Sequence, residues 1–296
     1  MDVIDMSCDR LRARSSGTGP TVICLHSSGA SGQQWQALAE QLIGFHVVRV
    51  DAHGHGQSPM PALDAPVFDL DAQALAPTLL RAREGVHLVG HSYGAALALR
   101  LALALPRQVR SLTLFEPVLF SLLLGAGADA AAREDILQVG RTIGLWVGMR
   151  QPVRAARSFV DFWSGPGSWQ RLAARQQQTV VQRMPVIAAH FRSLLGSGVR
   201  LQHVRQLKVP TLLMSGARSR RAALALVDML AEAWPHAQLQ RFANAGHLAP
   251  MTQARPVNAH IERFLTSVER QRAAEHHQFA AALRFAPRAE GALVLA

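Results

Sequence analysis

The sequence is poor in several residue types, and each scarcity narrows the possible functions. Its two cysteines among 296 residues, Cys8 and Cys24, have neither metal-ligand spacing nor the number that a disulfide framework needs. No apolar run approaches the roughly 20 residues of a membrane-spanning helix. The first ten residues, MDVIDMSCDR, carry acids where a secretory signal would have a basic start and an apolar stretch. We therefore expect a cytoplasmic protein without a membrane partner.

Lysine is almost absent, because Lys208 is the only lysine among 31 basic residues. The net charge of +11 would suit nucleic-acid binding. However, the arginines are spread along the whole chain, with no basic block among aromatic residues and no zinc-finger or RNP pattern. We therefore expect no nucleic-acid partner but a small-molecule substrate, and an anionic substrate or surface stays open. No feature of the sequence specifies an oligomeric state.

Buried strands alternate with helical patterns along most of the chain. Apolar residues make up 49% of the sequence, enough for a well-filled core. Strands are predicted at 21–25, 46–51, 86–90, 111–116, 211–216 and 238–242, with a leading hairpin near 2–6 and 10–14. Helices are predicted at 33–43, 71–83, 94–105, 222–234 and 253–268. This order predicts an α/β fold with a mostly parallel sheet flanked by helices, and a ligand crevice beyond the carboxyl ends of the strands.

The alternation breaks at 117–204, where the pattern is helical throughout. One apolar stripe runs through 136–147 and another through 153–163, a third helix is predicted at 169–183, and Pro185 is expected to begin a fourth. Helices inserted between two sheet strands predict a cap over the strand ends. We therefore divide the chain into a core (1–116 and 205–270), a helical cap (117–204) and a tail (271–296), with a helix in the first half of the tail and a loose end.

The stretch Gly90-His91-Ser92-Tyr93-Gly94 follows a predicted strand and opens a predicted helix. In that context the pattern G-x-S-x-G is typical of a nucleophile elbow, a sharp turn that exposes the serine hydroxyl. The alternative is a glycine-flanked helix cap without chemistry. The strand before it and the apolar helix after it favour the elbow.

At these residues the sequence resembles the α/β-hydrolase family, in particular its cap-bearing serine hydrolases, and the resemblance extends to about residue 268. Three further motifs support it: LHSSGASGQQW after the first parallel strand, DAHGHGQS at 51–58 and FANAGHLAPM near the end. The resemblance implies that His247 is the general base. It also implies an oxyanion hole from the backbone N–H groups of Tyr93 and Ser28, although Ser27 replaces the usual glycine after His26.

The acid of the implied triad is irregular. Most members of the family carry an aspartate soon after the strand at 211–216, where this chain has Arg218, Ser219, Arg220 and Arg221. Glu116 ends the strand at 111–116, the place from which haloalkane dehalogenases, for example, supply the acid. We therefore expect Glu116 to pair with His247. The alternative is that Glu116 caps a helix of the cap or pairs with an arginine.

A serine nucleophile with a histidine base performs acyl chemistry. Hydrolysis of an ester or thioester is the leading interpretation, and hydrolytic C–C cleavage or acyl transfer uses the same residues. A ligand-binding or receptor protein with little turnover is the alternative from another class. Aromatic residues of the cap suggest an apolar acyl or aryl group: Trp146, Phe159, Phe162, Trp163 and Trp169. We expect no metal and no cofactor, and we expect His26 and His91 to be hydrogen-bonding scaffolds.

Overall fold

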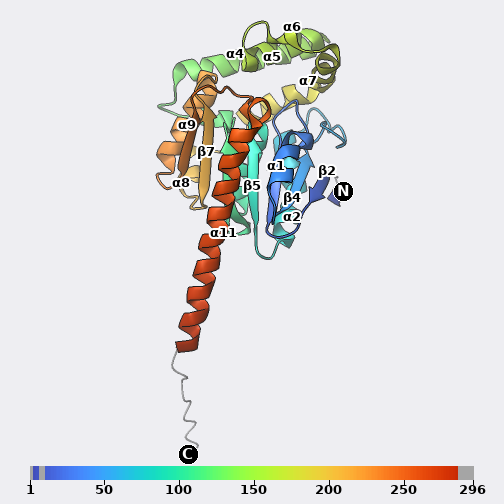
Figure 1. The fold of residues 1–296 in the computed structure, drawn as a ribbon. Coiled ribbons are helices and arrows are strands. Elements are labelled where there is room, and N and C mark those ends of the chain that lie inside the picture. Colours follow the sequence, from blue (N-terminus) through green and yellow to red (C-terminus); the bar gives the residue numbers. More distant parts are fainter. Residues whose placement is uncertain (1–2, 7–10, 286–296) are drawn as a thin grey trace, which may run out of the picture.

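The computed structural model describes residues 3–6 and 11–285, with side chains from 11 to 278. They form an eight-stranded sheet in the order β1-β2-β4-β3-β5-β6-β7-β8 (Figure 1). The pairs β1–β2 and β2–β4 are antiparallel, and the other five are parallel. The strands are β1 (Val3–Met6), β2 (Leu11–Ser16), β3 (Thr21–Leu25), β4 (His46–Asp51), β5 (Val86–His91), β6 (Val109–Phe115), β7 (Thr211–Gly216) and β8 (Gln238–Phe242). The predicted fold class and leading hairpin are confirmed.

The central strands are fully buried. Every residue of β5, β6 and β7 is buried, because helices cover these parallel strands on both faces of the sheet. Four strands have the predicted bounds, namely β3, β4, β7 and β8. The strand predicted at 111–116 instead spans Val109–Phe115, so Glu116 is the first residue after it.

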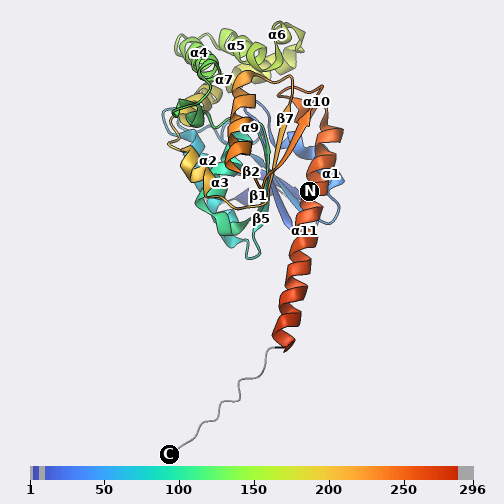
Figure 2. The same cartoon turned by 90° about the vertical axis from the view of Figure 1, so that its left-hand side faces the viewer.

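Helices cover both faces of the sheet, as Figure 2 shows. On one face lie η1 (Gly32–Trp35), α1 (Gln36–Gln41) and α11 (Ala254–Phe285), and on the other α2 (Val67–Arg81), α3 (Tyr93–Ala104) and α9 (Arg221–Ala233). The helix predicted at 253–268 continues to Phe285 and projects beyond the body of the fold (Figure 1). The predicted loose end lies outside the described residues from 286 on. Across the described residues, no helix has both the length and the apolar character that crossing a bilayer requires.

The chain between β6 and β7 is helical, as predicted. It forms η3 (Phe120–Leu124), α4 (Ala130–Gly148), α5 (Pro152–Ser164), α6 (Ser168–Arg171), α7 (Ala174–Leu195) and α8 (Leu201–Arg205). The inserted helices α4 to α7 lie over one end of the sheet (Figure 1). The remaining short helices are η2 (Pro106–Gln108) and α10 (Ala249–Thr252).

The prediction of separate helices at 169–183 and from Pro185 is wrong. Helix α7 runs through Pro185, and the short α6 precedes it. A proline inside a helix removes one backbone hydrogen bond and costs about 3 kcal/mol or more. Because Met184, Val186 and Ile187 beside it are all fully buried, their packing offsets this cost and keeps the helix continuous.

Candidate active site

A sharp turn between β5 and α3 places Ser92 at the carboxyl end of the sheet. Ser92 has φ +56° and ψ −114°, outside the regions that non-glycine residues favour. A Cβ at Gly90 would lie 2.4 Å from the carbonyl oxygen of Gly94, and a Cβ at Gly94 would lie 2.2 Å from that of Leu25. Both flanking positions therefore require glycine. The strand, turn and helix predicted around Ser92 are all present.

His247, in the loop after β8, lies between Ser92 and Glu116. Its Nε2 is 2.9 Å from Oγ of Ser92, and its Nδ1 is 2.6 Å from Oε2 of Glu116. Because the carboxylate accepts, Nδ1 carries the proton and Nε2 is free to accept from the Ser92 hydroxyl. The exposed fractions are 5% for Ser92, 3% for His247 and 0% for Glu116. The structure thus brings His247 next to Ser92, which is 155 positions away in the sequence, and next to Glu116, which is 131 positions away.

The carboxylate of Glu116 is fully buried but well bonded. Its Oε1 accepts from the backbone N–H of Gly216 at 2.8 Å and from the hydroxyl of Ser219 at 2.6 Å. Together with His247 these donors offset the cost of burying a charge. Of the two predicted partners, an arginine or His247, the described residues show His247 bonded to Glu116 and no arginine paired with it. The role of Ser219 was missed, since nothing in its local sequence links it to a residue 103 positions away.

An apolar cavity of about 290 Å³ opens at Ser92 and His247. Its apolar wall comes mostly from η3, α5 and α7 and includes Phe120, Phe159, Val160, Trp163, Phe191 and Leu194. Trp163 stacks on the His247 ring with 4.0 Å between ring centroids. Among the aromatic residues predicted to face the substrate, Phe159 and Trp163 line this cavity, whereas Trp146, Phe162 and Trp169 do not. Its described lining contains no aspartate, glutamate, lysine or arginine.

The loop at 27–30 forms one side of the cavity and is held by α7. Oγ of Ser28 lies 2.7 Å from Nδ1 of His190. The guanidinium of Arg183 donates to the carbonyl oxygens of Gly29 and Ala30, at 2.5 and 2.9 Å. The inserted helices therefore fix the conformation of this loop. Ser28 itself lines the cavity that Ser92 also reaches.

Tyr93 follows Ser92, but its side chain is directed elsewhere. The phenol is fully buried and donates to Oδ2 of Asp71 at 2.6 Å, and the ring stacks on His190 at 3.7 Å. Burial and the neighbouring Asp71 raise the pKa of Tyr93 well above its usual value, so the phenol stays protonated. Only the backbone of Tyr93 is therefore available to form interactions at Ser92.

Two further histidines organise the loops around the site. His26 donates from Nδ1 to the carbonyl of Ser27 at 2.8 Å and accepts at Nε2 from the N–H of Ala52 at 3.0 Å. Nε2 of His55 accepts from the N–H of Gly29 at 3.1 Å. Burial lowers the pKa of both imidazoles, which favours their neutral forms. The structure supports the predicted scaffold role of His26, and no three described His, Cys, Asp or Glu residues gather to hold a metal ion.

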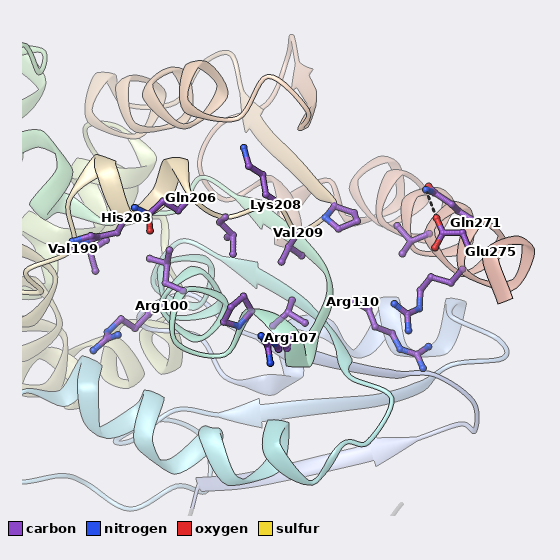
Figure 3. A pocket seen from close by; sticks show the side chains of 17 residues that line it. Arg100, Arg107, Arg110, Val199, His203, Gln206, Lys208, Val209, Gln271 and Glu275 are labelled. Atoms are coloured by element: carbon purple, nitrogen blue, oxygen red, sulfur yellow. Dashed lines mark hydrogen bonds between the residues drawn. The ribbon is translucent and has the colours of Figure 1, made fainter. Parts of the chain in front are cut away.

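A larger hollow, of about 820 Å³, lies at the opposite end of the strands (Figure 3). Basic residues line it, among them Arg100, Arg107, Arg110 and Lys208. The guanidinium of Arg110 pairs with Glu84 at 2.6 Å and with Glu269 at 2.7 Å, so part of this positive charge is neutralised within the protein. The hollow is separate from the cavity at Ser92, and none of its lining residues is shared with it.

Comparisons with known proteins point in one direction. A sequence profile described as "Alpha/beta hydrolase family" matches residues 22–260. "Lipase LipV" of Mycobacterium tuberculosis (strain ATCC 25618 / H37Rv) is 38% identical over 106 residues, which cover 35% of this chain and 40% of the lipase. "2-hydroxy-6-oxononadienedioate/2-hydroxy-6-oxononatrienedioate hydrolase 2" of Pseudomonas putida is 27% identical over 264 residues, covering 83% of this chain and 87% of that protein. The crystal structure of a hydrolase from Pseudomonas aeruginosa PA01 has the same fold, with a TM-score of 0.69, 22% identity, and coverage of 89% of this chain and 97% of that one.

Proposed function

This chain belongs to the alpha/beta hydrolase family, and we propose that it is a serine hydrolase that cleaves an ester or thioester of a small apolar substrate. The observation that carries the proposal is the bonded series Ser92–His247–Glu116, with distances of 2.9 and 2.6 Å, at an apolar cavity. Ser92 is the nucleophile, His247 the general base and Glu116 the acid that orients it. The ligand-binding alternative loses its main support, because the acid that seemed missing from the usual place is supplied by Glu116.

In the first half of the reaction, Oγ of Ser92 attacks the substrate carbonyl carbon while its proton passes to Nε2 of His247. Glu116 keeps Nδ1–H in place and stabilises the imidazolium that forms. The tetrahedral oxyanion accepts hydrogen bonds from the backbone N–H groups of Tyr93 and Ser28. His247 then protonates the leaving oxygen or sulfur as its bond to carbon breaks, which leaves an acyl group on Ser92.

In the second half, water replaces the leaving group. The water gives a proton to His247 as its oxygen attacks the acyl carbon, and the same oxyanion donors stabilise the second tetrahedral intermediate. Collapse breaks the bond to Oγ of Ser92, which regains its proton from His247. The products are the carboxylic acid and the alcohol or thiol, and the enzyme returns to its starting state.

The helical segment 117–204 acts as a cap in this proposal. Its helix α5 contributes Phe159 and Trp163 to the cavity wall, and its helix α7 holds the loop at 27–30 through Arg183 and His190. The remaining core, 1–116 and 205–270, supplies the three reacting side chains, and 271–296 is the tail. The cap therefore shapes the acyl site while the core performs the chemistry.

The cavity favours a neutral substrate over a dianionic one. The relative from Pseudomonas putida is named for a dienedioate, whose two carboxylates would need cationic or strongly donating partners. The cavity wall offers no lysine or arginine among its described residues. An uncharged apolar acyl group fits this wall better. For this reason ester or thioester hydrolysis ranks above C–C hydrolysis of such a substrate.

The proposal is tested by labelling with a fluorophosphonate, read by intact mass and peptide mapping. A single adduct on Ser92 is expected, together with turnover of short neutral esters. The variant Ser92→Ala should give neither. Ser164→Ala, which changes another serine of the cavity wall, is the matched control and should label like the parent. A folded parent protein that forms no adduct and cleaves no ester or thioester would contradict the proposal.

A further inference from the structure

A continuous series of hydrogen bonds links the loop at 27–30 to the loop of His247. The backbone N–H and the hydroxyl of Ser27 both lie 3.1 Å from Oε1 of Gln34. Nε2 of Gln34 lies 3.1 Å from Nδ1 of His91, and Nε2 of His91 lies 2.8 Å from the carbonyl oxygen of His247. Two side chains, from η1 and the last position of β5, thus bridge the two loops that surround Ser92.

The two ends of this series fix the direction of every bond in it. At one end a backbone N–H can only donate, so the atom of Gln34 that faces Ser27 is the amide oxygen. The amide nitrogen then faces His91 and donates to Nδ1. At the other end a backbone carbonyl can only accept, so Nε2 of His91 carries the proton. One arrangement satisfies all the bonds: neutral His91 with its proton on Nε2.

An imidazolium at His91 would break this arrangement, since a second N–H would face the amide nitrogen of Gln34. Burial, followed by the nearby His247, lowers the pKa of His91 well below its usual value. The ring is fully buried, lies 5.0 Å from the His247 ring and packs edge-on against Phe115 at 5.6 Å. His91 is therefore held in one tautomer and in one orientation.

We propose that Gln34 and His91 are positioning residues, which hold the backbone of His247 and the loop at 27–30 at a fixed position relative to each other. The inference rests on the proposed function, in which His247 is the base and this loop carries an oxyanion donor. Neither residue touches the reacting atoms. A shift of either loop would misalign the proton acceptor or the oxyanion donor, and a misplacement of about 1 Å can cost a factor of about 10² in rate. The series thus couples two loops that come from opposite ends of the core sequence.

Kinetics of matched variants test the proposal. Gln34→Leu removes the bridge, and we expect kcat and the rate of fluorophosphonate labelling to fall on the order of tenfold, with KM changed less than about threefold. Gln33→Leu, on the neighbouring exposed glutamine of the same helix, should behave like the parent. Thermal melts of both variants establish that they are folded. Equal kcat for the two variants would overturn the proposal.

Two substitutions of His91 test its hydrogen bonds to Gln34 and to His247 one at a time. A glutamine at 91 can reach the carbonyl of His247, as Nε2 does, whereas an asparagine reaches only as far as Nδ1 and keeps the bond to Gln34. Since each variant breaks the bridge at one end, we expect His91→Gln and His91→Asn both to lose about as much kcat as Gln34→Leu. Parent-like kcat in both variants would overturn the proposal.

A spectroscopic measurement tests the series without any substrate. NMR of protein labelled with ¹⁵N-histidine should show His91 neutral and protonated at Nε2 in the parent, and also in Gln34→Leu, where the carbonyl of His247 still accepts from Nε2. Protonation at Nδ1 in the parent would overturn the proposal. A parent that shows the expected tautomer but forms no fluorophosphonate adduct would instead contradict the proposed function, so the two failures are distinguishable.

Discussion

The hydroxyl of Ser219 donates a hydrogen bond of 2.6 Å to Oε1 of Glu116. Ser219 follows β7, where the resemblance to the α/β-hydrolase family places the acid, and Glu116 follows the neighbouring strand β6. The two side chains therefore meet from adjacent strand ends. The carboxylate reaches His247 from β6, and the residue after β7 serves as one of its donors.

Replacing this carboxylate should affect turnover far more than folding. In Glu116→Gln the amide keeps the size of the side chain but no longer stabilises the imidazolium of His247. We expect kcat to fall by about 10⁴, the effect of removing the acid of a related triad. Steady-state kinetics on an ester that the parent hydrolyses provide the measurement, with circular dichroism as a check on folding. Unchanged kcat in the folded variant would exclude Glu116 as the acid.

Ser219→Ala is the matched comparison for this prediction. It removes one donor to the same carboxylate but leaves the N–H of Gly216 and the ring of His247 in place. A hydrogen bond to a charged group contributes about 1.5 kcal/mol at the lower end of its range, so we expect a loss in kcat of roughly tenfold. A loss as large as that of Glu116→Gln would mean that Ser219, and not the carboxylate alone, maintains the site.

Local patterns predicted the bounds of four strands. The strands at 21–25, 46–51 and 211–216 read as apolar runs, as covered parallel strands do, whereas the strand at 238–242 was predicted with its bounds although it is largely exposed. The elbow at Ser92 was equally visible, since its glycines are required by contacts within 2.4 Å. The pairing of Glu116 with His247 was expected from the resemblance to the α/β-hydrolase family, some of whose members supply the acid from this strand end.

The relationships that the sequence did not reveal join residues far apart in the chain. The bond from Ser219 to Glu116 spans 103 positions and that from Arg183 to Gly29 spans 154. Such contacts depend on how elements pack, and no periodicity encodes them. The continuation of α7 through Pro185 has the same origin, because burial on both sides of the proline outweighs its local preference to end a helix.

Shortening a wall residue of the cavity should change the preferred acyl length. Phe159 lines the cavity from α5, and Phe159→Ala leaves room for a longer chain. Each additional buried methylene contributes about 0.8 kcal/mol, or roughly fourfold in kcat/KM. We therefore expect the optimum in a series of straight-chain esters to move to longer acyl groups. Phe162→Ala, three residues along the same helix and outside the cavity wall, should leave the optimum unchanged; an equal shift in both variants would contradict the proposed acyl site.

The elbow should not tolerate a side chain at Gly94. A methyl group there would lie 2.2 Å from the backbone oxygen of Leu25 and 2.6 Å from that of His26. Because the obstacle is backbone, we expect Gly94→Ala to lower the free energy of unfolding by about 3 kcal/mol or more. Gly144→Ala in α4 has open space around it and should raise that free energy, by up to about 1 kcal/mol. Denaturant unfolding of both variants gives the comparison, and equal stability of Gly94→Ala and the parent would contradict the elbow geometry.

Buried neutral histidines should make the fold sensitive to acid. Burial lowers the pKa of His87 and of His190 from 6.5 to about 3. Between these pH values the unfolded chain binds protons that the folded protein does not, so the free energy of unfolding falls as the pH drops from about 6.5 towards 3. Each such histidine contributes about 1.4 kcal/mol per pH unit well inside this window. Urea unfolding from pH 7.5 down to 5 should show this loss.

His190→Asn isolates one member of the group. An asparagine can still bond to the hydroxyl of Ser28, as Nδ1 of His190 does at 2.7 Å, but it does not titrate. The unfolding free energy of this variant should therefore fall less steeply with decreasing pH. Its slope should be smaller than that of the parent by about 1.4 kcal/mol per pH unit, the contribution of one titrating group. His276→Asn, which changes an exposed histidine of α11, is the matched control. If the slope for His190→Asn equalled that of the parent, His190 would be taking up its proton in the folded state too, and the stacked, buried ring could not be neutral.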